Sequence, residues 1–162
     1  MSILYLHGLE SSLSVDKRNV LEKFGMVHAP QIDYRKEINS IKNLLQDFKD
    51  KNITIVIGSS MGGFVGYYVA NGLQVPALLF NPALTYRSVH QEIPEVINSK
   101  SNFKHLVLGA NDDLIKPEDT LKFIGSSIGK DNYHLNIRQD LAHRIPVPVF
   151  QEEVKAFFKR LK

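Results

Sequence analysis

Ser60 stands at the centre of a Gly-x-Ser-x-Gly motif, because residues 58–62 read Gly-Ser-Ser-Met-Gly. The motif follows the apolar run 53–57 directly and precedes a stretch with a helical pattern, so the chain must turn sharply at the serine. Glycines at both ends of the motif remove Cβ atoms that would collide in such a turn, and the serine hydroxyl then projects from it. This pattern predicts a catalytic nucleophile at Ser60; the alternative is a glycine-rich turn whose serine caps the helix. Ser59 is the weaker candidate, because Ile and Met occupy its own flanking positions.

A serine hydroxyl is a weak nucleophile and needs a general base, usually a histidine held by a carboxylate. Among the six histidines, His143 lies in the loop 139–144, between the last predicted strand and the last predicted helix. That loop follows the carboxyl end of a strand, where ligands of parallel sheets bind. His105 begins a strand at its amino end, and His134 lies inside one. The sequence therefore predicts His143 as the base.

Two aspartates compete to be the carboxylate that holds this histidine. Asp112 and Asp113 follow the apolar run 105–108, and both lie between Ser60 and His143 in the chain. Either carboxylate could fix the tautomer of the histidine and stabilise its protonated form. The structural alternative is that one of them caps a helix that begins near residue 117.

The loop that follows the first apolar run carries the sequence His-Gly-Leu-Glu-Ser-Ser at residues 7–12. A backbone N–H from this loop and one from the residue after the nucleophile could stabilise an oxyanion, which predicts this role for Leu9 and Met61. Gly8 lets the backbone approach a substrate. His7 is better explained as a hydrogen-bonding residue beneath the loop than as a base.

Short apolar runs alternate with amphipathic stretches along the chain, which indicates βαβ units and a mostly parallel sheet. We predict an α/β fold, a three-layer sandwich of about six strands in the order 2-1-3-4-5-6. The predicted strands are 3–6, 27–32, 53–57, 77–80, 105–108 and 133–137. Helices are expected at 14–24, around 38–48, after residue 60, near residue 117 and at about 149–161.

The segment 81–104 separates the fourth predicted strand from the fifth, and it must supply a crossover helix. Little of it then remains to cover the site, so we expect a shallow groove that favours short acyl chains. We expect substrate-binding residues on its walls at Glu10, Leu84, Leu114 and Leu141, beside Leu9 and Met61.

The composition indicates a single domain, residues 1–162, with a sizeable core and no cysteine for disulfides or thiolate chemistry. The net charge of +3 raises the question of nucleic-acid binding, but 17 acidic residues are interleaved with the 20 Lys and Arg residues. No histidine and carboxylate cluster has the spacing of a metal site, and no phosphate-binding glycine motif is present. We therefore expect no metal, no cofactor, no nucleic acid and no membrane partner. We also expect a cytoplasmic protein that is a monomer or a weak homodimer.

Three sequence segments resemble the α/β-hydrolase superfamily, and more closely its small, lidless bacterial esterase branch. They are Leu-Tyr-Leu-His-Gly-x-x-Ser-Ser at 4–12, Ile-Gly-Ser-Ser-Met-Gly-Gly at 57–63 and Phe-Asn-Pro-Ala at 80–83. The similarity spans nearly the whole chain, and the Ser-x-x-Lys at 14–17 also fits that branch. The chain lacks the first two antiparallel strands and the cap domain of larger relatives.

The resemblance also implies roles for individual residues. In that branch the aspartate opens an Asp-x-x-hydrophobic turn, which favours Asp112 over Asp113, and the histidine sits in an x-His-x-hydrophobic loop, which matches His143. The chain order Ser, Asp, His is that of the superfamily. The expected function is therefore hydrolysis of a small carboxylic ester or thioester through an acyl-serine intermediate. The alternative from another class is a hydrolase-fold binding protein that has lost catalysis.

Overall fold

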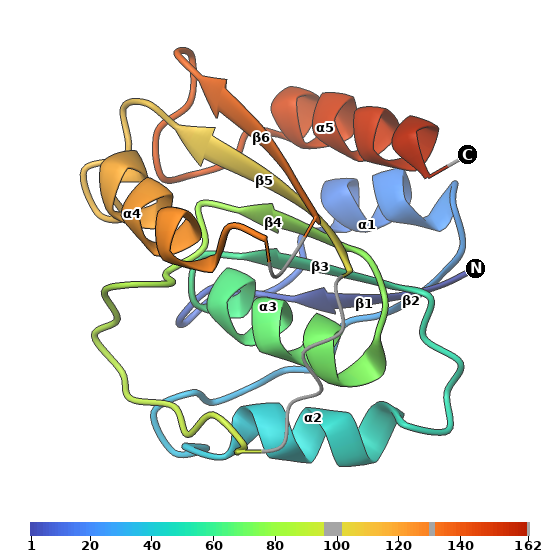
Figure 1. Ribbon diagram of the computed structural model, residues 1–162. Helices are drawn as coiled ribbons and strands as arrows, with labels where there is room; N and C mark the ends of the chain where they lie inside the picture. The colour runs from blue at the N-terminus through green and yellow to red at the C-terminus, as the bar shows by residue number, and fades with distance from the viewer. Residues whose placement is uncertain (96–101, 130–131, 162) are drawn as a thin grey trace.

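The computed structural model describes residues 1–95, 102–129 and 132–161, and its strands form one six-stranded sheet (Figure 1). The strand order is β2-β1-β3-β4-β5-β6, and every neighbouring pair is parallel, as the sequence predicts. The strands are β1 (Ser2–Leu6), β2 (Met26–His28), β3 (Ile55–Ser59), β4 (Ala77–Phe80), β5 (Phe103–Gly109) and β6 (Asn132–Arg138).

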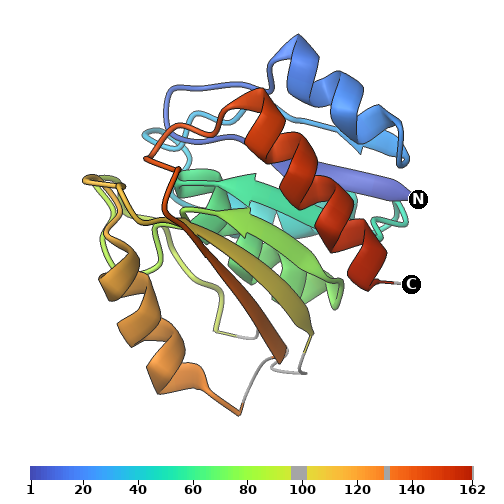
Figure 2. The ribbon, with the colours of Figure 1, turned by 90° about the horizontal axis from the view of Figure 1, so that it is seen from above.

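Five helices lie on the two faces of this sheet, which gives the predicted three layers (Figure 2). Helices α1 and α5 pack against each other on one face, and α2, α3 and α4 cover the other face. Their bounds are α1 (Val15–Glu22), α2 (Ser40–Phe48), α3 (Met61–Leu73), α4 (Pro117–Ser127) and α5 (Val147–Arg160). None of the helices in the described ranges is long and apolar enough to cross a membrane.

The central strands are apolar on both sides because each side packs against a layer of helices. In β1, Leu4 and Leu6 belong to the core beneath α2 and α3, whereas Ile3 and Tyr5 belong to the core beneath α1 and α5. These two cores hold the sheet between its two layers of helices. Because the strands are parallel, their carboxyl ends all lie at the same edge of the sheet.

Strand β2 is shorter than the predicted 27–32 and ends at His28. Pro30 has no N–H to give to a sheet. The backbone N–H of Ile32 does not join the sheet either, because it donates to Nε2 of His7 at 2.9 Å. The second half of the predicted strand therefore supports the loop after β1.

The crossover helix expected between β4 and β5 does not occur in residues 81–95, so that prediction is wrong for this part of the segment. Residues 96–101 lie outside the described residues. The chain from 81 to 95 is instead held against α3 and the loop before α2 by its side chains. The guanidinium of Arg87 lies 3.9 Å from the ring centroid of Phe64, and the amide of Gln91 donates to the carbonyl of Tyr34 at 2.8 Å. These side-chain contacts hold the segment against the rest of the protein, whereas a helix would need an apolar face to pack there.

Candidate active site

Ser60 lies at the turn between β3 and α3, in the backbone conformation φ 55° and ψ −117°. An L-residue with positive φ is strained and persists only where its surroundings hold it. Here the N–H of Ser60 donates to the carbonyl of Phe80 at 2.9 Å, and its carbonyl accepts from the N–H of Phe64 and of Ala83. The serine is thus fixed by its own helix and by the end of the neighbouring strand β4.

The glycines of the motif are needed for close backbone contacts. A Cβ on Gly58 would lie 2.2 Å from the carbonyl oxygen of Gly62, and a Cβ on Gly62 would lie 2.1 Å from the carbonyl oxygen of Leu6. Both distances are far below any real carbon–oxygen contact. Gly58 is therefore required by the tight strand–helix turn, as predicted from the motif, and Gly62 by the close approach of the end of β1.

Asp112 and His143 are joined by a hydrogen bond of 2.8 Å between Oδ2 and Nδ1. The other carboxylate oxygen of Asp112 accepts from the N–H groups of Leu114 and Ile115, at 2.9 and 2.8 Å. Because an ionised carboxylate can only accept, Nδ1 of His143 carries the proton and Nε2 is left as a base. Asp113 is exposed. Neither aspartate caps α4, which begins after Lys116 without a side-chain cap.

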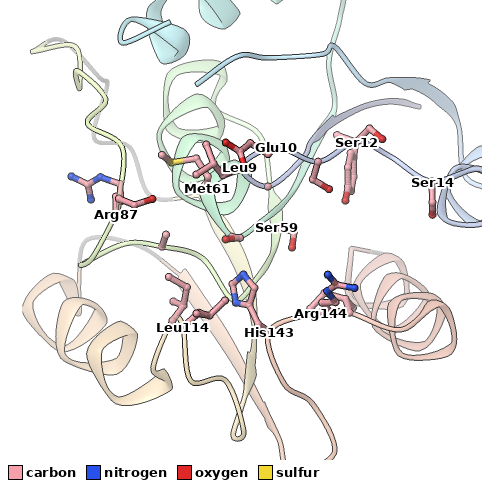
Figure 3. A pocket seen from close by; sticks show the side chains of 18 of the residues that line it. Leu9, Glu10, Ser12, Ser14, Ser59, Met61, Arg87, Leu114, His143 and Arg144 are labelled. Carbon is pink, nitrogen blue, oxygen red and sulfur yellow. The ribbon is translucent and has the colours of Figure 1, made fainter. Parts of the chain in front are cut away.

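A cleft of about 760 Å³ brings Ser60 and His143 together with four other predicted site residues, Leu9, Glu10, Met61 and Leu114 (Figure 3). Among the described hydrogen bonds, His143 has Asp112 as its side-chain partner, and Ser60 bonds through its backbone. In unliganded active sites the hydrogen bond between the nucleophile and its general base is often long, and it shortens when a substrate binds.

The loop with Leu9 is held beside Ser60 by His7. Nε2 of His7 accepts from Ile32, and Nδ1 donates to the carbonyl of Gly8 at 2.7 Å, so both ring nitrogens are used. A Cβ on Gly8 would lie 3.5 Å from the Cβ of Ser60, which shows how close the loop approaches the serine. His7 therefore has a structural position, and residues 8–12 of the loop line the cleft.

Two of the expected wall residues, Leu84 and Leu141, do not line the cleft. They are 3% and 0% exposed and belong to the two hydrophobic cores. Leu84 is buried together with Ala83 and Val89 of the same segment, in the core that also contains residues of α3. Leu141 is buried in the core beneath α5, its carbonyl accepts from the N–H of Asn111, and its own N–H donates to the carbonyl of Arg138.

Several residues that line the cleft were not predicted from the sequence, among them Tyr5, Lys17, Tyr86, Arg87 and Arg144. Burial lowers the pKa of Lys17 and raises the pKa of Tyr5 to about 12. Lys17 belongs to the Ser-x-x-Lys at 14–17, and Arg144 directly follows His143, so both lie in or next to motifs that the sequence shows. Their position in the cleft could not be predicted, because it depends on how α1 and α5 pack.

Asn81 was also missed as a site residue, although the sequence Phe-Asn-Pro-Ala around it was noticed. It is buried, with φ 41°, at the end of β4. Its side chain bonds to the backbone of Gly109, Ala142 and His143. The signal that could have identified it is an asparagine directly after a predicted strand, where polar residues serve the site.

Within the described residues, no three His, Asp or Glu side chains lie close enough together to hold a metal ion.

Comparisons with known proteins relate the chain to one family and one fold. Three solved structures share its fold over nearly its whole length. An α/β-superfamily protein from Xanthomonas campestris pv. campestris is 16% identical, with a TM-score of 0.72 over 98% of each chain. The alpha/beta hydrolase domain-containing protein 10 from mouse is 12% identical, with a TM-score of 0.71 over 99% of this chain and 90% of that one. Esterase PE8 is 15% identical, with a TM-score of 0.70 over 99% of this chain and 92% of that one.

A search among curated proteins gave no match. The model of the Uncharacterised protein family (UPF0227) matches residues 2–114, which include Ser60 and Asp112. The chain therefore belongs to the UPF0227 family and has the α/β-hydrolase fold.

Proposed function

We propose that this protein is a serine hydrolase that cleaves a small carboxylic ester or thioester through an acyl-enzyme. The observation that carries the proposal is the 2.8 Å bond between Asp112 and His143, in a cleft that His143 shares with the strained Ser60. A pure binding role needs neither the turn at Ser60 nor this pair. The low-identity likeness to structures named as a hydrolase and an esterase agrees with it.

In the proposed reaction, Ser60 Oγ adds to the carbonyl carbon of the substrate while Nε2 of His143 takes its proton. The oxygen of the tetrahedral intermediate becomes negative and is stabilised by the N–H groups of Leu9 and Met61. Met61 is the first residue of α3, where an N–H has no partner within the helix.

The intermediate then collapses, the bond to the leaving group breaks, and His143 gives its proton to the leaving oxygen or sulfur. Water repeats the sequence on the acyl-enzyme, with His143 again as base, and releases the carboxylic acid. Asp112 keeps the ring of His143 in the required tautomer and stabilises its protonated form throughout.

A fluorophosphonate probe tests the proposal, because it reacts with activated serines. We expect one adduct per chain, on Ser60, and none in the Ser60→Ala variant. The Ser59→Ala variant is the matched control and should still be labelled on Ser60. Hydrolysis of 4-nitrophenyl acetate should fall about 10⁴-fold in Ser60→Ala. An unlabelled wild type, or a Ser60→Ala variant with more than a few per cent of wild-type turnover, would show that the assignment is wrong.

A further inference from the structure

The two sides of the cleft differ in chemistry. Figure 3 shows Leu9, Met61 and Leu114 on one side of Ser59 and His143, together with Glu10 and Arg87, and it shows Ser12, Ser14 and Arg144 on the other side. Lys17 lines the cleft as well, and its own N–H donates to Oγ of Ser14. The first side thus combines apolar side chains with one acidic and one basic residue, while the second combines hydroxyls with two cations.

These two cations are not neutralised by carboxylates of the described residues. Arg144 is exposed and has no ion pair there, and Nζ of Lys17 lies over the ring of Phe150 at 5.4 Å from its centroid. Three other arginines do have carboxylate partners: Arg18 lies 3.5 Å from Glu22, Arg35 lies 2.8 Å from Glu10, and Arg138 lies 2.7 Å from Asp140.

The other charged residues of the cleft already have partners. Glu10 lies 2.8 Å from Arg35. The guanidinium of Arg87 covers the ring of Phe64 and donates to the carbonyl of Leu84 at 3.1 Å, and Figure 3 shows it directed away from His143. An uncompensated positive charge therefore remains on the side of Lys17 and Arg144.

We propose that Lys17 and Arg144 bind an anionic group, a phosphate or a carboxylate, on the leaving group of the substrate. The proposal rests on the proposed function and specifies its substrate class: esters or thioesters of an acidic alcohol or thiol. The acyl group lies on the apolar side, against Leu9, Met61 and Leu114. The leaving group lies on the other side, because Arg144 adjoins His143, which must protonate the leaving atom.

The geometry of the backbone favours the same ligand. Lys17 lies in the first turn of α1, and Arg144 lies just before α5, so two helices begin beside this side of the cleft. The positive ends of the helix dipoles add to the field of the two side chains. Guanidinium and ammonium groups form short, charge-assisted hydrogen bonds to phosphate and carboxylate oxygens.

The test compares esters that differ only in the charge on the leaving group: phenyl acetate, 4-acetoxybenzoate and 4-acetoxyphenyl phosphate. We expect the ratio of kcat/KM for each anionic ester to that for phenyl acetate to fall about tenfold in Lys17→Gln and in Arg144→Gln. Comparing this ratio between each variant and the wild type cancels the different chemical reactivities of the esters. The matched control is Lys155→Gln, an exposed cation of α5 that does not line the cleft, and its ratio should be that of the wild type.

A second pair of esters tests on which side of the cleft the anionic group binds. 4-Nitrophenyl hemisuccinate carries its charge on the acyl group, and 4-nitrophenyl butyrate is the neutral counterpart. If the two variants lower this ratio instead, the anion is on the acyl side and the proposal is overturned. Unchanged ratios in both variants for all esters overturn it as well. Between the phosphate and the carboxylate, the larger loss identifies the anion for which the site is built.

Binding measurements test the anion site independently of the proposed hydrolase activity. In the Ser60→Ala variant, 4-hydroxyphenyl phosphate should bind more tightly than phenol, and Lys17→Gln in that background should remove most of the difference. If the fluorophosphonate fails to label Ser60 while this preference persists, the hydrolase proposal fails and the anion site remains. If Ser60 is labelled and the preference is absent, the anion site alone is wrong.

Discussion

Asn81 donates a hydrogen bond from its side-chain Nδ2 to the backbone carbonyl of His143, at 3.2 Å. The same nitrogen donates to the carbonyl of Ala142 at 2.9 Å, and Oδ1 accepts from the N–H of Gly109 at 2.7 Å. One buried amide therefore links the end of β4, the end of β5 and the loop that carries the histidine. Asn81 touches no substrate atom in the proposed reaction, so it is a positioning residue.

We predict that Asn81→Asp slows hydrolysis and fluorophosphonate labelling about tenfold, with a smaller effect on KM than on kcat. Aspartate has the same shape and also tolerates positive φ, but it cannot donate to the two loop carbonyls. The cost of leaving buried carbonyls unpaired is about 1–3 kcal/mol, and it should appear in urea unfolding. If stability falls by this amount while the labelling rate is that of the wild type, Asn81 serves the fold alone.

We predict that Asp112→Asn lowers kcat about 10³-fold or more, whereas Asp113→Asn stays within a few fold of the wild type. Only Asp112 bonds to Nδ1 of His143, and an amide in its place can present its NH₂ group and favour the wrong tautomer. The neighbouring Asp113 is exposed and serves as the matched control. Steady-state kinetics with 4-nitrophenyl acetate measure both, and equal losses would contradict the assignment.

The buried carboxyl of Glu153 makes the free energy of unfolding depend on pH within a defined range. Burial raises the pKa of this carboxyl, but donors from His105, Arg138 and Asn136 lower it more, so that the pKa falls from 4.5 to about 2. Asn136 and Arg138 donate to Oε1 at 2.7 and 2.9 Å, and Nε2 of His105 lies 3.5 Å from Oε2.

A carboxyl whose pKa is lower in the folded state than in the unfolded state stabilises the fold at pH values above the unfolded-state pKa. This contribution is lost as the pH falls through the folded-state pKa. We therefore predict that the free energy of unfolding drops by roughly 3 kcal/mol between about pH 5 and pH 2 through this group. In Glu153→Gln that part of the drop should disappear, while Glu152→Gln, an exposed partner of Arg138, should retain it. Urea titrations across this pH range measure all three proteins, and parallel curves for all of them would contradict the role of Glu153.

We predict that kcat/KM of acyl esters peaks at about two to six acyl carbons and falls beyond them. The apolar side of the cleft is formed by few residues, because Leu84 and Leu141 are buried in the cores. Binding energy from a long chain is gained only where the protein can contact its remote atoms. A series of 4-nitrophenyl esters at concentrations below micelle formation measures the profile. Rates that rise steadily to twelve carbons would indicate an acyl tunnel and contradict this expectation.

The positions of the strands and the turn at Ser60 could be predicted from the sequence because local patterns mark them. Runs of β-branched residues mark the strands, and Gly58 is required by a backbone contact within the turn, whereas Gly62 is required by the close approach of the end of β1. The placement of Asp112 and His143 at strand ends follows from the same alternation of strands and helices.

The rest depends on contacts between distant segments. Leu84, Leu114 and Leu141 are alike in sequence, but Leu114 is 64% exposed while the other two are buried, and only tertiary packing decides between them. The segment 81–95 has enough residues for a helix, yet Arg87 and Gln91 hold it extended against partners that lie 20 to 60 residues earlier in the chain. Lys17 and Arg144 meet in one cleft only because α1 and α5 pack together.

The strand order gives the candidate site a particular relation to folding. Ser60, Asn81, Asp112 and His143 follow β3, β4, β5 and β6, so four neighbouring strands each contribute one residue. With strands about 4.8 Å apart, the residues are spread across roughly 14 Å of the sheet edge. No hairpin or half-sheet can assemble them. Among the described residues the last of these strands, β6, pairs with β5 alone, and the loop after it carries the base. During refolding, the return of reactivity at Ser60 would therefore report the docking of this outermost strand.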